Sequence, residues 1–422
     1  MTVDDPQSIL RALFDRAVAV ADPMRVVPSA LPERPAGRLV VVGAGKASAR
    51  MAEAVETVWG PCDGLVITRY GYGRPTKGIE IFEAAHPVPD EAGARATERM
   101  LDLLAGLGPE DLVLALISGG GSALLTAPAG AITLQEKMAV NDALLRSGAP
   151  IDQMNVVRKH LSRVKAGQLA ATAHPARVTT IMISDVPGDD PAAIASGPTV
   201  AEDSTPQDAQ AILERYAIVV PAAVWGQLSK GSGAIPTGSP LLENTENRIV
   251  AAPSMSLEAA AGEARKAGLD VRILGDALEG EARDLGAEHA DMALDIRGKL
   301  AAGAAPVLLL SGGECTVSGR GNGVGGPNAE YVLAAALRLE GAQDVHVLAC
   351  DTDGVDGADE VAGAYAGPET LAQARAAGAL PEGALDAHDS HGFFERAGTQ
   401  IVTGPTLTNV NDFRAMLILP SG

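Results

Sequence analysis

One pattern recurs along the chain and restricts its fold: a short continuous apolar run, a glycine-rich or acidic turn, and then a stretch of helical composition. Continuous apolar runs of this length are typical of strands buried on both faces, as in parallel sheets covered by helices. The alternation therefore predicts an α/β fold. The predicted strands are residues 39–42, 64–68, 112–117, 178–183, 248–251, 271–274, 307–310 and 345–349.

The chain is too long for a single hydrophobic core. It has 422 residues, whereas single cores stop growing at about 250–300 residues and longer chains divide into domains. Residues 230–240, KGSGAIPTGSP, are rich in Gly, Ser and Pro and lack an apolar period, as linkers do. We therefore predict an N-terminal Rossmann-like α/β domain, residues 1–235, with a parallel sheet flanked by helices, and a smaller C-terminal α/β domain, residues 236–422.

The charge balance excludes some classes of partner. The 33 Lys and Arg residues are outnumbered by 53 Asp and Glu residues, which gives a formal net charge of −20. Nucleic acid and anionic membranes are not expected to bind such a surface, and an anionic ligand would require a local group of cations. The three cysteines lack metal-type spacing, and the N-terminal residues MTVDDPQSIL lack the features of a signal peptide. With no apolar run of membrane-spanning length, these features predict a cytoplasmic protein.

The segment GAGKAS, residues 43–48, places a lysine where a strand turns into a helix. It matches neither the dinucleotide-binding fingerprint nor the Walker A loop. Gly43 and Gly45 allow a tight turn whose backbone N–H groups can hold an anion at the helix N-terminus. Lys46 is unfavourable to the helix dipole there, so its place has an evident benefit only beside a bound anion. The alternative is a solvated lysine on a tight turn.

Two predicted strands end in Ser-Gly-Gly. SGGGS, residues 118–122, combines glycines that let backbone approach a ligand with serine donors, as in a phosphate nest. Residues 311–326 form a longer glycine-rich loop that suits a polyphosphate, and Arg320 is its only cation. That arginine can neutralise a transferred phosphoryl group. The alternative for 118–122 is a plain flexible turn.

A run of cations at residues 155–170, NVVRKHLSRVKAGQLA, contradicts the acidic character of the chain. On a continuous helix, Arg158, Ser162 and Lys165 share one face, which predicts a site for an anionic substrate. The alternative is a solvated basic face.

Aspartates follow two other predicted strands. Asp185 comes directly after residues 178–183, with Asp189 one turn later, and Asp351 and Asp353 follow residues 345–349. Grouped carboxylates at strand ends suit Mg²⁺, which takes a few carboxylates together with phosphate oxygens. An aspartate there can also act as general base towards a hydroxyl group. The alternative is a role in turns and helix caps.

Taken together, these segments resemble the glycerate kinase family, whose C-terminal part is the MOFRL domain and one of whose relatives was long called a hydroxypyruvate reductase. The matching segments are GAGKAS (43–48), ISGGGSALL (117–125), VRKHLSRVKAGQLA (157–170), SDVPGDDPAAIASGPTV (184–200), LEGEARDLG (278–286), LLSGGECTV (309–317), CDTDGVDG (350–357) and VTGPTLTNVND (402–412).

The resemblance implies phosphorylation of D-glycerate to 2-phosphoglycerate with ATP and Mg²⁺, in a cleft between two α/β domains. It implies catalytic roles for Lys46, Asp185 and Arg320. Substrate would be held by Arg158, Ser162 and Lys165, and the metal by Asp189, Asp351 and Asp353. The implied nucleotide and phosphate ligands are Gly43, Gly45, Ser118, Gly119, Gly120, Gly121, Ser122, Ser311, Gly312, Gly313, Glu314, Asn328 and Asn409.

One position departs from the family pattern. Many members have Gly-Gly-Arg-Asn where this chain has Gly325, Gly326, Pro327 and Asn328. The charge of that arginine would then have to come from Arg320 or Arg158.

Three alternatives stay open. One is an NAD(P)H-dependent hydroxypyruvate reductase, against which the missing fingerprint counts. Another is phosphorylation at the 3-hydroxyl group, and a third is non-catalytic binding of a small acid. The sequence leaves a monomer and a homodimer equally open.

Overall fold

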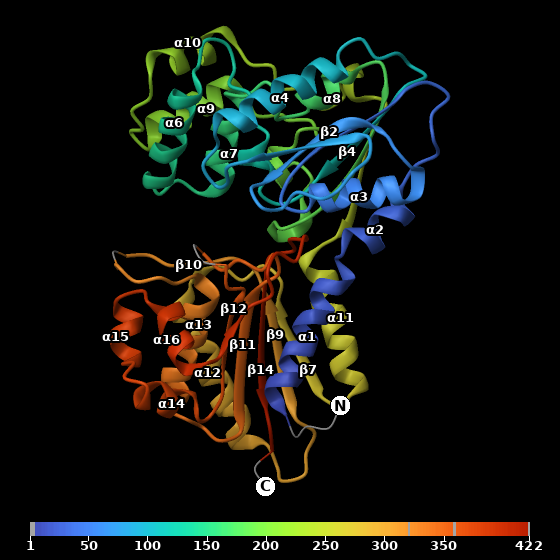
Figure 1. Ribbon diagram of the computed structural model, residues 1–422. Helices are drawn as coiled ribbons and strands as arrows, with labels where there is room; N and C mark the ends of the chain where they lie inside the picture. Colours follow the sequence, from blue (N-terminus) through green and yellow to red (C-terminus); the bar gives the residue numbers. More distant parts are fainter. Residues whose placement is uncertain (1–4, 320, 358–359, 421–422) are drawn as a thin grey trace. The chain divides into compact units, whose positions relative to one another are not determined.

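The computed structural model describes residues 5–319, 321–357 and 360–420, and they form two compact units (Figure 1). The parallel-sheet unit comprises Pro23–Asp185 and Asp189–Val250. The mixed-sheet unit comprises Met1–Asp22, Val186–Gly188 and Ala251–Gly422. This division differs from the predicted boundary at residues 235 and 236 for two reasons. Strand β6 (Thr245–Ala251) completes the first sheet, and helix α1 (Pro6–Val20) packs on helix α11 (Pro253–Lys266) of the second unit.

The parallel-sheet unit is built on a six-stranded sheet with the order β3-β2-β1-β4-β5-β6. The pairs β1–β2, β2–β3, β1–β4 and β4–β5 are parallel, as predicted. Every residue of β4, LVLALI, is buried, which explains why the strand reads as a continuous apolar run. The other strands are β1 (Leu39–Ala44), β2 (Asp63–Arg69), β3 (Ile79–Ala84), β4 (Leu112–Ile117) and β5 (Arg177–Ile183).

Helices of this unit fall into two groups. Helices α3 (Ser48–Trp59) and α4 (Glu91–Leu104) pack on the sheet, and α2 (Pro23–Ala30) packs on α3. Four others form a cluster with its own apolar core, drawn in green beside the sheet in Figure 1. They are α6 (Leu134–Arg146), α7 (Ile151–His160), α9 (Pro206–Arg215) and α10 (Ala222–Lys230). The short helices α5 (Gly121–Leu124) and α8 (Gln168–Ala173) follow turns at the sheet edge.

The mixed-sheet unit has the strand order β13-β12-β11-β14-β9-β7. The last strand, β14, lies between β9 and β11 and is antiparallel to both. The prediction of parallel strands was therefore wrong for most of this sheet. The sequence pattern did not reveal β14, which separates β9 from β11. The strands are β7 (Asp270–Gly275), β9 (Val307–Gly312), β11 (Val345–Asp351), β12 (Gly363–Ala366), β13 (Gln400–Ile401) and β14 (Asp412–Ile418).

Helices cover both faces of this sheet. Along β9, Leu308 and Leu310 join the core beneath α1 and α11, whereas Val307 and Leu309 join the core on the opposite face. That opposite face carries α12 (Ala282–Lys299), α13 (Pro327–Leu339), α14 (Thr370–Ala376), α15 (Pro381–Asp386) and α16 (Ser390–Ala397) (Figure 1). The short strands β8 (Gly280–Glu281) and β10 (Cys315–Thr316) form a separate pair.

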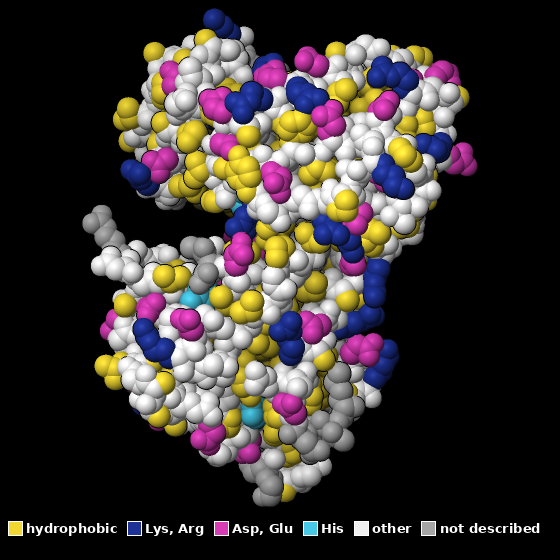
Figure 2. All heavy atoms as spheres, in the orientation of Figure 1, with side chains coloured by type: hydrophobic (Ala, Val, Ile, Leu, Met, Phe, Trp, Pro, Cys, Tyr) yellow, Lys and Arg dark blue, Asp and Glu magenta, His cyan; other side chains and the backbone are white. Residues whose placement is uncertain are grey.

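Two surface properties bear on the choice of partner. Within the described ranges, none of the helices has both the length and the apolar composition needed to cross a membrane. On the face shown in Figure 2, acidic and basic side chains are interspersed rather than gathered by sign. On this face, the charge pattern does not mark a site for an anion.

Candidate active site

Two strand-to-helix turns meet at the carboxyl edge of the parallel sheet. The turn after β1 contains Lys46, whose backbone N–H donates to Gly119 O at 2.8 Å in the turn after β4. The next N–H, that of Ala47, donates to Ser118 Oγ at 3.0 Å. The contact requires glycine, because a Cβ atom on Gly45 would lie 2.1 Å from that Ser118 hydroxyl oxygen. The segments 43–48 and 118–122 therefore form one packed substructure.

This packing changes the interpretation of GAGKAS. The N–H of Gly45 donates to Ile67 O at 3.1 Å and that of Ser48 to Gly45 O at 3.2 Å, so the N–H groups from Gly45 to Ser48 all have partners within the protein. The expectation of a turn that exposes its N–H groups was wrong, because the neighbouring turn uses them. What this turn offers a ligand is the half-buried Lys46 side chain, whose stem passes within 3.3 Å of where a Cβ atom on Gly120 would lie.

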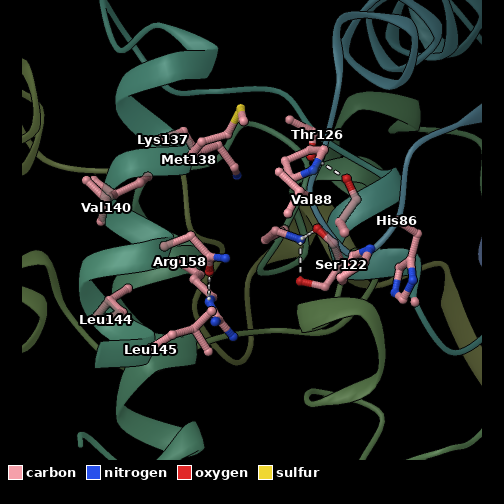
Figure 3. Close-up of a pocket in the computed structure, with 17 residues that line it drawn as sticks. His86, Val88, Ser122, Thr126, Lys137, Met138, Val140, Leu144, Leu145 and Arg158 are labelled. Carbon is pink, nitrogen blue, oxygen red and sulfur yellow. Dashed lines mark hydrogen bonds between the residues drawn. The ribbon is translucent and has the colours of Figure 1, made fainter. Parts of the chain in front are cut away.

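A pocket of about 300 Å³ opens beside the SGGGS turn, entirely within the parallel-sheet unit. In Figure 3, side chains of helix α6 face those of Val88, Thr126 and Ser122 across the pocket. The lining residues are His86, Pro87, Val88, Pro89, Gly120, Ser122, Ala123, Thr126, Lys137, Met138, Val140, Asn141, Leu144, Leu145, Arg158, Leu161 and Lys165.

Three basic side chains line this pocket: Lys137 from α6, Arg158 from α7 and Lys165 from the turn that follows α7. Among the described residues that line it, none is Asp or Glu. In a chain of net charge −20, this is the local group of cations that an anionic ligand requires. The aliphatic side chains of α6 complete the opposite wall.

The cations influence one another. Burial lowers the pKa of Lys165 well below its usual value, and the charges of Lys137, Arg158 and Lys159 lower it further. Burial, with a contribution from Arg158, lowers the pKa of Lys137 to about 8. A bound anion would relieve this repulsion, so the protein without ligand carries an electrostatic strain that favours binding.

Uncharged partners hold Arg158 in place. Its Nε atom donates to Asn141 Oδ1 at 2.7 Å, and Nη1 donates to Asn155 Oδ1 at 3.2 Å. Neither amide oxygen neutralises the guanidinium, which therefore keeps its full charge for a ligand.

Lys165 is held just as firmly. Its Nζ atom donates to Ser122 O at 2.7 Å and to Ser122 Oγ at 2.9 Å. The Ser122 hydroxyl in turn lies 2.9 Å from Ser196 Oγ. The lysine thus links its own turn to the SGGGS turn and to the 3₁₀ turn Ile194–Ser196.

The prediction of a continuous helical face through Arg158, Ser162 and Lys165 was wrong. Helix α7 ends at His160. Ser162 lies in the following turn, where its Oγ atom accepts the N–H groups of Val164 at 3.2 Å and Lys165 at 3.3 Å. Ser162 is absent from the pocket lining, so its observed role is to fix the turn that carries Lys165.

The four basic side chains of residues 155–170 have two kinds of surroundings. Lys159 Nζ donates to Glu202 Oε2 at 2.5 Å, and both side chains are largely buried. Arg163 forms an exposed ion pair with Glu98. Half of the run therefore faces acids, and the other half lines the pocket.

The four candidate metal ligands are divided between the two units, two in each. Asp185 follows β5 at the same sheet edge as the SGGGS turn, and Asp189 ends the 3₁₀ turn Pro187–Asp189. In the mixed-sheet unit, Asp351 Oδ1 accepts the N–H of Asp353 at 2.8 Å, and Asp353 Oδ1 accepts that of Val355 at 2.7 Å. Within the described residues, no group of three or more His, Cys, Asp or Glu is arranged to hold a metal ion. Asp351 and Asp353 thus perform the turn-forming role left open above.

The predicted residues at the end of β9 belong to a buried network of the mixed-sheet unit. Arg414 Nη1 donates to Gly312 O at 3.1 Å and Nη2 to Gly313 O at 2.7 Å. The same arginine forms an ion pair with Asp412 at 2.7 Å. Ser311 is buried on the same strand, whereas Glu314 is exposed. These carbonyl groups are thereby fixed by a side chain that the sequence did not single out.

Asn328 connects two buried acids. Its Nδ2 atom donates to Asp412 Oδ1 at 2.6 Å and to Asp356 Oδ1 at 3.3 Å. Asp356 also accepts the first N–H groups of α13 and caps that helix from a distant segment. Burial raises the pKa of Asp356 to about 6 although the charge of His391 opposes the shift. Two predicted site residues are still to be placed. Asn409 is buried, and its Oδ1 atom accepts a backbone N–H at 3.3 Å. Arg320 lies outside the described residues.

Sequence reasoning missed several pocket residues. Lys137 stands alone in an amphipathic helix, Asn141 lies one turn further on, and His86 precedes a proline on a loop. Ser196, which contacts Ser122 but does not line the pocket, carried no signal beyond the segment 184–200. The three pocket residues have no local signal, because their role arises from the packing of α6 and of the turn 86–89 around the pocket.

The fold and the pocket together define an α/β protein with a cation-lined site for a small anionic ligand at the edge of a parallel sheet. Comparison with known proteins makes the assignment specific. The chain matches the model described as "Domain of unknown function (DUF4147)" over residues 9–229 and that of the MOFRL family over residues 307–412. It therefore belongs to the glycerate kinase family.

Individual relatives span nearly the whole chain. A protein of Agrobacterium vitis named "Putative hydroxypyruvate reductase" is 54% identical over 416 residues, covering 98% of this chain and 94% of that one. The D-glycerate 2-kinase of Thermotoga maritima is 37% identical over 422 residues, covering 98% and 100%. The crystal structure of a glycerate kinase from Thermotoga maritima superposes with a TM-score of 0.87 at 35% identity, covering 98% of this chain and 99% of that one.

Proposed function

We propose that this protein transfers the terminal phosphoryl group of ATP to the 2-hydroxyl group of D-glycerate and forms 2-phosphoglycerate. The observation that carries the proposal is the pocket lined by Lys137, Arg158 and Lys165 and by no carboxylate among the described residues. The names of two relatives support this choice of reaction. They are the D-glycerate 2-kinase of Thermotoga maritima and the glycerate 2-kinase of Pyrococcus horikoshii, which is 38% identical over 428 residues.

Each basic residue is assigned a part of the substrates according to its position. Arg158 and Lys137 bind the carboxylate of glycerate. Lys46 lies against Gly120 at the edge of the pocket and meets the phosphate groups. Phosphoryl transfer depends mainly on positioning and on neutralising charge, so a site made of fixed cations suits it.

The proposal includes Mg²⁺ bound to the nucleotide. When bound, the ion neutralises phosphate charge and needs only one or two protein carboxylates, since phosphate oxygens and water complete its shell. Asp185 and Asp189, which follow β5, are the carboxylates of this unit proposed for that need, and the Oδ1 atom of Asp189 is buried with no hydrogen-bond partner among the described residues. For Asp351 and Asp353 a metal role stays a prediction.

A coupled assay tests the reaction directly. Purified protein with D-glycerate and Mg-ATP is expected to release ADP, and phosphorus NMR of the product identifies the phosphorylated hydroxyl group. Replacement of Lys46 with alanine is expected to lower kcat about 10²–10³-fold, because a charge that stabilises the transferring group is lost. The matched control is Lys77→Ala, which removes an exposed lysine of the same unit. Near-normal turnover of the Lys46 variant would remove that lysine from the mechanism.

The name of the Agrobacterium vitis relative favours one competing function, an NAD(P)H-dependent reductase of hydroxypyruvate. The segment GAGKAS lacks the third glycine of the dinucleotide fingerprint, and its N–H groups are engaged in the protein. We expect NADH and NADPH oxidation with hydroxypyruvate to stay at background. Oxidation above background with no release of ADP from ATP and glycerate would reverse the assignment.

A further inference from the structure

Deep burial and two hydrogen bonds at its amino group give Lys165 surroundings that suit an uncharged amine. Its side chain is buried at 1% exposure, and its Nζ atom donates to two oxygens of one residue, Ser122 O and Ser122 Oγ. An uncharged amine carries two hydrogens and one lone pair, so these two bonds use both hydrogens. Because Lys165 also lines the pocket, the remaining tetrahedral direction is available to a ligand there.

The backbone around this lysine is fixed. Ala166 and Gly167, which follow it, have φ angles of 55° and 77°, and their N–H groups donate to Ser196 O at 3.2 Å and Gly197 O at 2.8 Å. Ser196 itself has a φ angle of 63°. Left-handed conformations in residues other than glycine cost free energy and persist where the surrounding structure enforces them, often at functional sites. The turns at residues 166–167 and 196–197 thus fix the position of the Lys165 amine relative to the hydroxyl groups of Ser122 and Ser196.

The charged groups around Lys165 all disfavour its protonation. Lys137 approaches from α6, and Arg158 and Lys159 approach from α7. Among the described residues, the acid paired with one of these cations is Glu202, which binds Lys159. Burial and these three cations lower the Lys165 pKa in the same direction, which is how proteins adapt lysine for use as a base at neutral pH.

The pocket offers few other proton acceptors. Asp185, one of the aspartates that the sequence offered as a base, is not among the lining residues, and no carboxylate is found there within the described chain. Lys137 is half-buried on a helix, whereas Lys165 is fully buried and held by two hydrogen bonds. His86 is the remaining titratable group of the lining, and its variant therefore belongs in the test.

We propose that Lys165, as an uncharged amine, is the catalytic base that accepts the proton of the substrate hydroxyl group. As the hydroxyl oxygen forms its bond to the γ-phosphorus of ATP, the bond from that phosphorus to the bridging oxygen breaks. ADP leaves with the electron pair, and the proton passes to Lys165 Nζ. The Ser122–Ser196 pair acts as a positioning element that keeps the amine aimed at the pocket. This inference rests on the proposed function.

The first test separates kcat from KM. Lys165→Met removes the base and leaves Arg158 and Lys137 to bind the substrate carboxylate, so kcat is expected to fall about 10²–10⁴-fold while KM changes little. A variant that keeps a tenth or more of the wild-type kcat would overturn the proposal. His86→Gln is expected to keep the acidic limb of the pH–rate profile, and loss of that limb would assign the base to His86 instead.

The second test alters the basicity of the amine. Lys165→Cys, alkylated with bromoethylamine, restores an amine whose pKa is lowered by the neighbouring sulfur. We expect activity to return with the acidic limb of kcat/KM moved to lower pH. Wild-type protein treated in the same way is the control for its own cysteines, which are all buried. Restored activity with an unmoved limb, or none after complete alkylation of folded protein, would refute the assignment.

A third measurement does not depend on kinase activity. Nitrogen-15 labelling of lysine Nζ atoms, with the Lys165 signal identified by its loss in Lys165→Met, reports protonation directly. An uncharged Lys165 at pH 7 supports the inference, and a charged one up to pH 9 overturns it. If the wild-type protein released no ADP with glycerate, the proposed function would fail, and this readout would still show whether the lysine is poised as a base.

Discussion

Replacement of Arg158 with methionine tests whether the pocket is built for an anion. The guanidinium donates to the uncharged side chains of Asn141 and Asn155, and no Asp or Glu lines the pocket within the described residues. Its charge is therefore available to a ligand rather than neutralised by the protein. The variant keeps most of the aliphatic stem and removes the charge and both hydrogen bonds.

The expected magnitudes follow from these contacts. Hydrogen bonds between such groups contribute about 0.5–1.5 kcal/mol each, so the loss of two costs about 1–3 kcal/mol of unfolding free energy. Removal of a cation beside Lys137 and Lys165 offsets part of that cost. A charge-assisted contact with a ligand carboxylate is worth about 1.5–3 kcal/mol, which corresponds to about a ten- to hundredfold change in affinity. We expect KM for D-glycerate to rise by that factor with a small loss of stability.

Arg163→Met is the matched control. Arg163 belongs to the same basic run but pairs with Glu98 on the surface, and exposed pairs are worth about 0–1 kcal/mol. Initial rates over a range of glycerate concentrations, calorimetric titration with glycerate, and urea unfolding measure the three quantities. A KM of the Arg158 variant within twofold of the wild type, or an equal rise in the Arg163 variant, would refute the argument.

Two further predictions concern the support of the site. Lys159→Met leaves Glu202 largely buried without its partner and is expected to cost about 3–5 kcal/mol in urea unfolding, most of it recovered when Glu202 is also replaced by leucine. Burial raises the pKa of Glu202, but hydrogen bonds from Lys159 and Ser204 outweigh it and lower the pKa overall. This stabilisation is therefore complete above the unfolded carboxyl pKa of about 4.3 and is lost as the pH falls through the lower folded value. Unfolding curves in that window should converge for wild type and Lys159→Met, and a constant gap would count against the ion pair. Gly45→Ala places a Cβ atom 2.1 Å from a serine hydroxyl at φ 143°, whereas Gly60→Ala at φ 73° meets open space, so the first should lower the thermal midpoint clearly more than the second. Equal shifts would contradict the close contact between the two turns.

The sequence predicted those parts of the fold that depend on local pattern. All eight predicted strands are present; six of them are almost fully buried, whereas β6 and β7 are only partly buried. Strand β14, DFRAMLI, was missed because Asp412 and Arg414 interrupt its apolar character. Both charges are buried, and they satisfy one another and the carbonyl groups of β9. Such compensation is a tertiary property that no window of sequence displays.

The candidate site was predictable only in part for the same reason. Arg158 and Lys165 stood out because a basic run is conspicuous in an acidic chain. Lys137 did not stand out, since a single lysine on a helix is ordinary until packing turns it towards two other cations. Ser162 was misplaced because the helix ends early, at His160, and the strained residue Ala166 that follows carries no glycine signal of its own.

The position of β14 has a consequence for how the protein is made. This strand, residues 412–418, separates β9 from β11 in the middle of its sheet, yet it leaves the ribosome after every other strand. The parallel-sheet unit can assemble while translation is still under way, because domains generally fold as units in order of synthesis. Helix α1, among the first segments made, must wait for almost the whole chain before its sheet is complete. A ribosome stalled before residue 412 would carry a folded parallel-sheet unit and a mixed sheet that lacks its central strand β14. Chaperones bind nascent chains with such unpaired strands.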